Sequence, residues 1–195
     1  MYLAIKRATD ICLSLIGILF FLPFAIIIAI LIFIESGRPA FYIQKRVGKN
    51  GKIFDLYKFR SMVNGAERHT GPIWAKRNDP RITSIGRMLR KTRLDEFPQL
   101  LNVLKGEMSL VGPRPERPEI IEYLKREIPE YTRRLQLKPG ITGLAQVNHH
   151  YDSCLDDVRK KLACDFYYME NQNLLIDLQI FLKTVGVVLT GRGAH

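Results

Sequence analysis

The sequence predicts an α+β protein that is mainly helical, with one membrane helix followed by a cytosolic domain. Three observations lead to this prediction. An uncharged apolar run occupies residues 11–34, two β-rich runs flank an Asn-Gly pair at 50–51, and helical patterns dominate the rest of the chain. We expect a re-entrant membrane helix over residues 1–36 and a membrane-associated cytosolic domain over residues 37–195, with a small β-hairpin and several helices, some at the membrane interface.

The composition suits a partner rich in phosphate. The chain has 195 residues, of which 30 are Lys or Arg and 19 are Asp or Glu, and the net charge is +11. Such an excess favours nucleic acid, an anionic bilayer surface or a nucleotide as partner. Cys12, Cys154 and Cys164 form no CxxC pair, which indicates a reducing, cytosol-facing compartment without a zinc site. His149 and His150 are adjacent, and this spacing does not suit a metal site.

The apolar run at residues 11–34 is long enough for a membrane helix, since about 20 residues cross a bilayer core. It is too long for a signal peptide and lacks a cleavage site. Pro23 at its centre removes a backbone hydrogen bond and favours a kink. Basic residues flank both ends, and the positive-inside rule places both flanks in the cytoplasm. We therefore expect a helix that enters, bends at Pro23 and returns; a kinked spanning helix is the alternative. The flanking basic residues are Lys6, Arg7, Arg38, Lys45, Arg46, Lys49 and Lys52.

A β-hairpin is expected next in the chain. Residues 41–47 and 53–59 are β-rich and enclose Asn50-Gly51, the strongest short hairpin signal. A polar loop at residues 61–80 follows, in which Trp74 fits a headgroup anchor as well as a partly buried side chain.

Helical patterns fill most of the remaining sequence. Ile85, Met88 and Leu89 share one helical face, and Gly106 provides a C-terminal stop for a helix that begins near Asp95. Ser153 and Asp156 form a capping-box variant at the start of a further helix. The final helix has a wide apolar face, which indicates packing in the core or at the membrane surface. The predicted helices cover about 95–105, 118–127, 130–137, 153–170 and 173–190.

Asp95 and Glu96 are the candidate catalytic pair. Aspartate is a preferred N-cap, so capping is the ordinary explanation for it. Basic residues crowd this pair, however, and Arg114 lies between two prolines that restrict its backbone. Arginine forks bind phosphate oxygens, Mg²⁺ is held by one or two carboxylates with substrate phosphates, and an aspartate can attack phosphorus. The basic residues that precede the pair are Arg87, Arg90, Lys91 and Arg93.

Seven stretches along the chain carry a resemblance to a known family. The longest is LDEFPQLLNVLKGEMSLVGPRP at 94–115. The others are KRATD at 6–10, the apolar segment with its central proline, YKFRSM at 57–62, LKPGITGLAQVN at 137–148, DFYYMEN at 165–171 and the helix around Asp177. The sequence resembles the small monotopic phosphoglycosyl transferases, the bacterial sugar transferase family. It departs from close relatives at Leu22, where Ser is frequent, and at Ala145, where Trp is frequent.

The resemblance implies a ping-pong reaction. Asp95 matches the nucleophile that attacks the β-phosphorus of a UDP-sugar and releases UMP, and the phosphosugar stays on Asp95 until polyprenyl (undecaprenyl) phosphate takes it. Glu96 matches the second acid, as a Mg²⁺ or proton-transfer partner, so Asp95 and Glu96 are also the candidate Mg²⁺ ligands. Four basic residues are implied to bind substrate phosphate: Lys58, Arg60, Arg90 and Arg114.

The resemblance also implies a monotopic protein of the bacterial inner membrane that faces the cytoplasm. Its reaction would be the first membrane step of exopolysaccharide, O-antigen, capsule or glycoprotein synthesis. The expected partners are a UDP-sugar, polyprenyl phosphate and anionic lipid headgroups, with no nucleic acid and with a homodimer left open. The chain looks like the minimal catalytic form, since larger relatives carry extra N-terminal helices. No stretch of the sequence indicates which sugar the donor carries.

Two other functions fit parts of the sequence. A membrane-anchored basic scaffold or binding protein would explain the charge but has no need of the acidic pair, and no nucleic-acid-binding motif is visible. A UDP-sugar hydrolase would use the same residues with water in place of the lipid acceptor.

Overall fold

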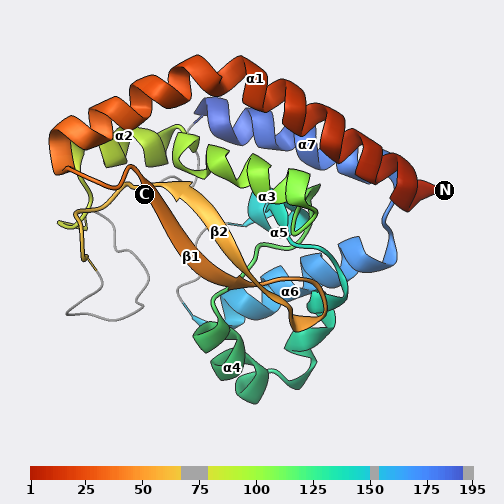
Figure 1. The fold of residues 1–195 in the computed structure, drawn as a ribbon. Helices are drawn as coiled ribbons and strands as arrows, with labels where there is room; N and C mark the ends of the chain where they lie inside the picture. Colours follow the sequence, from red (N-terminus) through yellow and green to blue (C-terminus); the bar gives the residue numbers. More distant parts are fainter. Residues whose placement is uncertain (67–78, 150–153, 191–195) are drawn as a thin grey trace.

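The computed structural model of the chain describes residues 1–66, 79–149 and 154–190. Helix α1 (Tyr2–Ser36) lies along one side of the molecule with α7 (Leu174–Thr190), and α2 (Ser84–Lys91) and α3 (Leu100–Lys105) lie beneath it (Figure 1). A β-hairpin crosses the middle, and α4 (Pro118–Glu127) and α6 (Leu155–Glu170) lie on the opposite side. The protein is mainly helical with little β-structure, as predicted.

Helix α1 is continuous through Pro23 and bends near its middle (Figure 1). Among the described residues it is the one helix long and apolar enough to cross a membrane, with a mean hydropathy of 3.1 in its most apolar stretch. Most of its large apolar side chains are exposed, including Leu19, Phe20 and Ile34. Only Asp10, Ser14, Ile28 and Ile32 are buried along its 35 residues. The bend agrees with the sequence prediction, whereas re-entry into a membrane stays a prediction.

The predicted hairpin has the predicted boundaries. Strands β1 (Phe41–Val47) and β2 (Ile53–Phe59) pair antiparallel, with Phe41 opposite Phe59 and Val47 opposite Ile53. The connection contains a short 3₁₀-helix, η1 (Lys49–Gly51), in which Asn50 and Gly51 have φ of 56° and 80°. Asparagine and glycine tolerate this left-handed conformation, which is why the Asn-Gly pair marks the turn. Trp74 of the following loop lies outside the described residues.

Two predicted helices, α4 and α7, match their expected ranges, and α2 contains the predicted helical face of Ile85, Met88 and Leu89. Two other predictions need correction. The expected helix at 95–105 is divided into a 3₁₀-helix, η2 (Leu94–Gln99), and α3, which ends at Lys105 and is followed by Gly106 with φ 82°. The expected helix at 130–137 is also a 3₁₀-helix, η3 (Pro129–Gln136). Pro98 lies inside η2, where it lacks the N–H that an α-helix interior requires. Pro129 is the first residue of η3, a position that an α-helix also tolerates, so it does not explain the 3₁₀ geometry of that segment.

Helix α6 differs from its prediction at the N-terminus. Its N-cap is Cys154, with no side-chain cap hydrogen bond, so the described part of the chain does not contain the expected capping box. Ser153, the expected cap, lies outside the described residues. The helix ends at Glu170, as predicted.

A two-stranded parallel sheet joins segments for which the sequence analysis predicted no strand. Strand β3 (Ser109–Val111) pairs with β4 (Gly140–Thr142), and the short helix α5 (Leu144–Asn148) follows. A Cβ atom on Gly140 would lie 2.1 Å from the nitrogen of Gly112, so only glycine permits this close approach of the two backbones. The sheet fixes the segment that carries Arg114.

The core consists of four small clusters between the elements. One joins α1 and α2 to the end of β2 through Ile32, Leu89 and Phe59; another joins α4, η3 and α6 through Leu124, Tyr131 and Leu162. The other two pack β3 against the hairpin and against α7. The hairpin and α3 therefore lie at the centre of the domain, next to η2.

Candidate active site

The acidic pair lies in the 3₁₀-helix η2, directly after a left-handed residue. Arg93 has φ 61° and precedes the helix, and its carbonyl accepts a hydrogen bond from the Glu96 amide at 3.2 Å. Asp95 and Glu96 are both buried, with 7% and 8% of their surface exposed. The pair therefore starts a 3₁₀ turn rather than the α-helix that the sequence predicted. Residues from α2, β2 and the loop after β3 surround it.

Glu96 is neutralised by two cations. Its Oε1 accepts hydrogen bonds from Lys58 Nζ and from Arg114 Nη2, each at 2.8 Å. Burial alone would raise the pKa of this carboxyl, but Arg114 and Lys58 outweigh burial and hold the pKa well below its ordinary value. Burial lowers the pKa of Lys58, against the attraction of Glu96. Glu96 is therefore an ionised group held in a fixed position.

Asp95 differs from its neighbour in its pairing and in the direction of its pKa shift. Within the described residues its carboxylate forms no hydrogen bond and no ion pair. Burial raises the pKa of Asp95, and the adjacent Glu96 charge adds to this effect while Lys58 opposes it. A carboxylate that is poorly solvated and unpaired is a better nucleophile than one already engaged by cations. The geometry thus distinguishes two side chains that are chemically alike in the sequence.

The four predicted phosphate-binding residues are not all placed alike. Lys58 and Arg114 meet at Glu96, as described above. Arg90 Nε donates to the Ser61 hydroxyl at 2.8 Å. The charge of Arg90 acts to lower the pKa of Asp95, against the effect of burial. Arg60 is 94% buried and its Nη2 donates to the backbone oxygen of Ser36 at 2.9 Å, at the C-terminal end of α1. The structure thus gives Arg60 a helix-capping contact, and its binding of phosphate stays a prediction.

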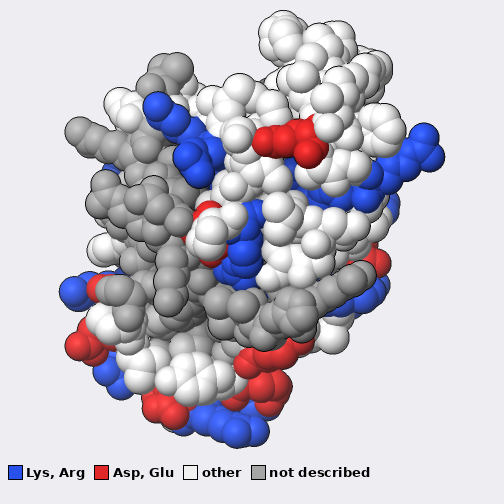
Figure 2. All heavy atoms as spheres, turned by 90° about the vertical axis from the view of Figure 1, so that its left-hand side faces the viewer, with Lys and Arg blue, Asp and Glu red and all other residues white. Residues whose placement is uncertain are grey.

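The face that carries α2 and the C-terminal end of α1 has both basic and acidic side chains among uncharged ones. Figure 2 shows Lys and Arg side chains near the centre of this face, with acidic side chains among them and uncharged side chains above. The Lys and Arg side chains near its centre attract anions from solution.

The charged residues of the KRATD stretch, which the sequence analysis gave only as part of a resemblance, bind the N-terminal half of α1 to the rest of the domain. Lys6 Nζ binds Asp177 Oδ2 of α7 at 2.8 Å, and the Tyr2 hydroxyl donates to the same oxygen at 2.9 Å. Arg7 donates to the carbonyls of Val103 and Leu104 at the end of α3, at 2.6 and 2.8 Å. Asp10 Oδ1 accepts from the amide of Leu110 at 2.9 Å and from the Ser109 hydroxyl at 3.1 Å. These contacts bind the start of α1 to three elements of the domain.

The acidic pair fits Mg²⁺ better than it fits a metal held by protein ligands alone. The described residues contain no group of three His, Cys, Asp or Glu that could hold a metal. Mg²⁺ commonly binds one or two carboxylates and completes its shell with water and substrate phosphates. The carboxylate of Asp95 and Oε2 of Glu96, which accepts no hydrogen bond from the described residues, supply two such oxygens.

Comparison with known proteins decides the family. A model of the bacterial sugar transferase family matches residues 1–191, almost the whole chain. The chain belongs to the bacterial sugar transferase family. Family membership agrees with the resemblance inferred from the motifs.

Three relatives of this sugar transferase carry undecaprenyl phosphate in their names. The chain is 46% identical over its whole length to an Aeromonas hydrophila UDP-N-acetylgalactosamine-undecaprenyl-phosphate N-acetylgalactosaminephosphotransferase, of which it covers 46%. It is 55% identical over 69% of its length to a putative undecaprenyl-phosphate N-acetylgalactosaminyl 1-phosphate transferase of Bacillus subtilis, covering 74% of that protein. A Caulobacter vibrioides UDP-glucose:undecaprenyl-phosphate glucose-1-phosphate transferase is 40% identical, with 97% of this chain and 72% of the relative covered. The chain thus spans about half the length of the Aeromonas relative, and the relatives' names differ in the sugar.

Two residues of the sugar transferase were missed by the sequence analysis. Arg134 and Asp165 form a buried ion pair at 2.7 Å next to the segment of Arg114. Asp165 begins the DFYYMEN stretch, so the resemblance included it without indicating a role. Arg134 had no local signal, since it is one of two adjacent arginines in η3.

Proposed function

We propose that this sugar transferase moves a sugar 1-phosphate from a UDP-sugar to a polyprenyl phosphate such as undecaprenyl phosphate, with Asp95 as nucleophile. The observation that carries the proposal is the contrast between the buried, unpaired Asp95 and Glu96, which Lys58 and Arg114 neutralise. The names of the relatives support the two substrates. The reaction is the first membrane step of a bacterial glycan pathway.

The reaction proceeds in two displacements at one phosphorus atom. An Asp95 oxygen attacks the β-phosphorus, the bond from that phosphorus to the bridging oxygen breaks, and UMP leaves. A phosphate oxygen of the lipid then attacks the same phosphorus, the bond to Asp95 breaks, and the polyprenyl diphosphate sugar is released. Arg114 and Lys58 lie where they can bind phosphate oxygens of the donor. Asp95 and Glu96 would hold Mg²⁺, which would supply positive charge to offset that of the diphosphate.

A two-step route suits substrates that arrive from different phases. The donor is soluble in water and the acceptor is held in the bilayer, so a covalent intermediate removes the need to bind both together. Incubation of the purified protein with a panel of UDP-sugars, with and without polyprenyl phosphate, tests the function through UMP release and labelled lipid. Without lipid the proposed mechanism releases at most one UMP per protein molecule, so repeated turnover to UMP without lipid would indicate a hydrolase. No UMP release from any donor would refute the transferase.

Arg114 is predicted to bind phosphate through its planar fork. Arg114→Lys keeps the charge but cannot form two parallel hydrogen bonds, so kcat/KM for the UDP-sugar should fall about 10- to 100-fold, the value of one or two charged hydrogen bonds. Steady-state rates measure this loss. Activity of the Lys variant equal to wild type would reduce Arg114 to a source of general positive charge.

The membrane arrangement we propose is monotopic, with α1 dipping into the cytoplasmic leaflet. Both ends of α1 are bound to the same domain: Lys6 contacts Asp177, and Glu35 at the other end accepts hydrogen bonds from the amides of Ser84 and Ile85 at 2.7 and 3.0 Å. A straight helix across the bilayer would place these two ends about 50 Å apart on opposite sides, since each residue adds about 1.5 Å. The domain would then have to contact both surfaces.

Cysteine labelling tests this topology. In a background without the native cysteines, single cysteines at positions 3 and 50 should both react only from the cytoplasmic side. Replacing Pro23 by Ala should restore the backbone donor and straighten α1, which would produce a mixed topology and reduce lipid-dependent turnover more than expression. Labelling of position 3 only from the periplasm would show that α1 spans the bilayer.

A further inference from the structure

The segment that carries Arg114 is fixed through its carbonyl groups. Pro113 and Pro115 have no N–H, so the segment offers few other backbone groups for hydrogen bonding. Four consecutive carbonyls each accept a hydrogen bond from a distant part of the chain. The donors are the Gly140 amide to Pro113 at 2.9 Å, Arg134 Nη2 to Arg114 at 3.0 Å, Arg46 Nη1 to Pro115 at 3.0 Å, and the Val47 amide to Glu116 at 2.9 Å.

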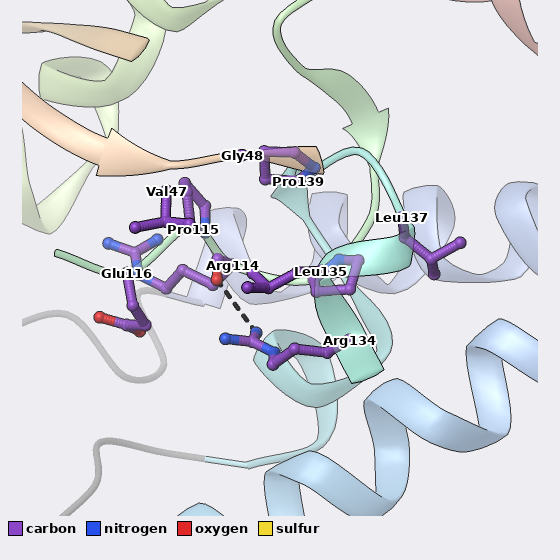
Figure 3. Close-up of a pocket in the computed structure, with 10 residues that line it drawn as sticks. Val47, Gly48, Arg114, Pro115, Glu116, Arg134, Leu135, Leu137 and Pro139 are labelled. Carbon is purple, nitrogen blue, oxygen red and sulfur yellow. Dashed lines mark hydrogen bonds between the residues drawn. The ribbon is translucent and has the colours of Figure 1, made fainter. Parts of the chain in front are cut away.

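The donor to the carbonyl of Arg114 itself is a buried guanidinium. Arg134 is 94% buried, and Figure 3 shows its side chain directed at that carbonyl in a pocket that Pro115 and Pro139 also line. Its Nε and Nη2 both contact Asp165 Oδ2 of α6 at 2.7 Å, and its Nη1 donates to the Tyr131 hydroxyl at 2.9 Å. Burial by itself would lower the pKa of Arg134, but Asp165, Tyr131 and Glu116 together raise this pKa above its ordinary value. All three nitrogen atoms of the fork are therefore engaged.

Stability alone does not account for this pair. A buried ion pair loses solvation that its attraction only partly returns, and an apolar pair of similar size often stabilises a fold as well or better. An apolar pair cannot donate a hydrogen bond to the Arg114 carbonyl. The ion pair thus supplies a hydrogen-bond donor to the backbone carbonyl of Arg114, the residue whose side chain reaches Glu96.

We propose that Arg134, oriented by Asp165, is a positioning residue that sets the Arg114 guanidinium on the donor diphosphate. The inference rests on the proposed function, because it assigns Arg114 to phosphate binding. Asp165 fixes the fork of Arg134, the fork fixes the carbonyl of Arg114, and the neighbouring prolines transmit this position to the side chain. A shift of about 1 Å at a catalytic group can reduce the rate about 100-fold. Loose anchoring of the segment that carries Arg114 should therefore reduce kcat/KM.

The test replaces the ion pair by an apolar pair. Arg134→Met with Asp165→Leu should keep the melting temperature within a few degrees of wild type, while kcat/KM for UMP release falls about 10- to 100-fold. Tyr131→Phe is the matched control, because it removes a hydrogen bond from the same guanidinium but leaves the contact with Arg114; its kcat/KM should stay within about twofold. If the apolar pair does not fold, Asp165→Asn alone takes its place, since it keeps the size of the side chain.

A double-mutant cycle separates positioning from a structural role. In an Arg114→Ala background the apolar pair should reduce kcat/KM by less than about twofold, because the guanidinium to be positioned is absent. An equal loss in both backgrounds would overturn the proposal, and so would wild-type activity of the apolar pair in the Arg114 protein. A structural role alone predicts such equal losses.

Binding of UDP in the absence of turnover keeps this test independent of the reaction. The apolar pair should weaken UDP binding, measured by calorimetry, by about tenfold in the Arg114 protein and leave it unchanged in the Arg114→Ala protein. If UDP binding follows this pattern but no donor yields UMP, the positioning role holds and the proposed chemistry fails. If UDP binding is the same in the apolar-pair and wild-type proteins, Arg134 does not position the Arg114 side chain.

Discussion

Replacing Asp95 by Asn should reduce UMP release below about one thousandth of the wild-type rate and should stabilise the protein at neutral pH. The amide has nearly the same size as the carboxyl but cannot attack phosphorus, and loss of a nucleophile costs several orders of magnitude. No cation is withdrawn from Asp95 by this change, because within the described residues its carboxylate has no ion pair. Radiolabelled UDP-sugar turnover and intact mass, which would detect the phosphosugar adduct, measure the catalytic effect.

The stability gain follows from the direction of the pKa shift. The pKa of Asp95 is raised by burial in the folded state, above its ordinary value of 3.8. The native state therefore binds this proton more tightly than the unfolded state, and ionisation of Asp95 destabilises the fold. The gain from Asp95→Asn should be complete above the raised pKa and should vanish as the pH falls below the ordinary value. Melting temperatures across this pH range measure it. A variant that melts lower than wild type at neutral pH would contradict the assigned environment, and substantial UMP release would remove Asp95 as nucleophile.

Replacing Glu96 by Gln should also abolish most activity but should destabilise the protein. Glu96 accepts hydrogen bonds from Lys58 and Arg114, and its pKa is depressed because those cations outweigh burial. Its charge therefore stabilises the fold above the ordinary carboxyl pKa, and this contribution is lost as the pH falls through the depressed value. Removing one member of a buried ionic cluster costs about 3 kcal/mol. The neighbouring isosteric variants Asp95→Asn and Glu96→Gln should thus shift the melting temperature in opposite directions at pH 7.

The role of Glu96 in metal binding can be measured in the same proteins. Excess EDTA should abolish UMP release by the wild type, and Mg²⁺ should restore it. Glu96→Gln should need a higher Mg²⁺ concentration for its residual activity. Full wild-type activity in excess chelator would end the metal hypothesis. A Glu96→Gln variant with unchanged Mg²⁺ dependence would leave Glu96 as an anchor for Lys58 and Arg114.

Local sequence signals predicted the elements that depend on neighbouring residues. The hairpin has its predicted boundaries because Asn50-Gly51 adopts positive φ, and α7 has its expected range because its apolar pattern is long. The division at Leu94–Gln99 was not predicted, although Pro98 is visible in the sequence, because a proline in the first turn is compatible with an α-helix as well. The parallel pairing of β3 with β4 joins segments about 30 residues apart, which local patterns cannot indicate.

The sequence by itself determined the family, the bent apolar helix and the acidic pair. Only the tertiary structure decided which acid is paired with cations and which, among the described residues, is not. Lys58 and Arg114 lie 38 and 18 positions from Glu96 in the chain, and both reach its Oε1 because β2 and the loop after β3 converge on η2. The pKa of a buried carboxyl depends on the charges within a few ångströms of it, and those distances are set by packing rather than by position in the sequence. The same holds for Arg134, whose donation to the carbonyl of Arg114 requires η3, α6 and the loop after β3 to meet.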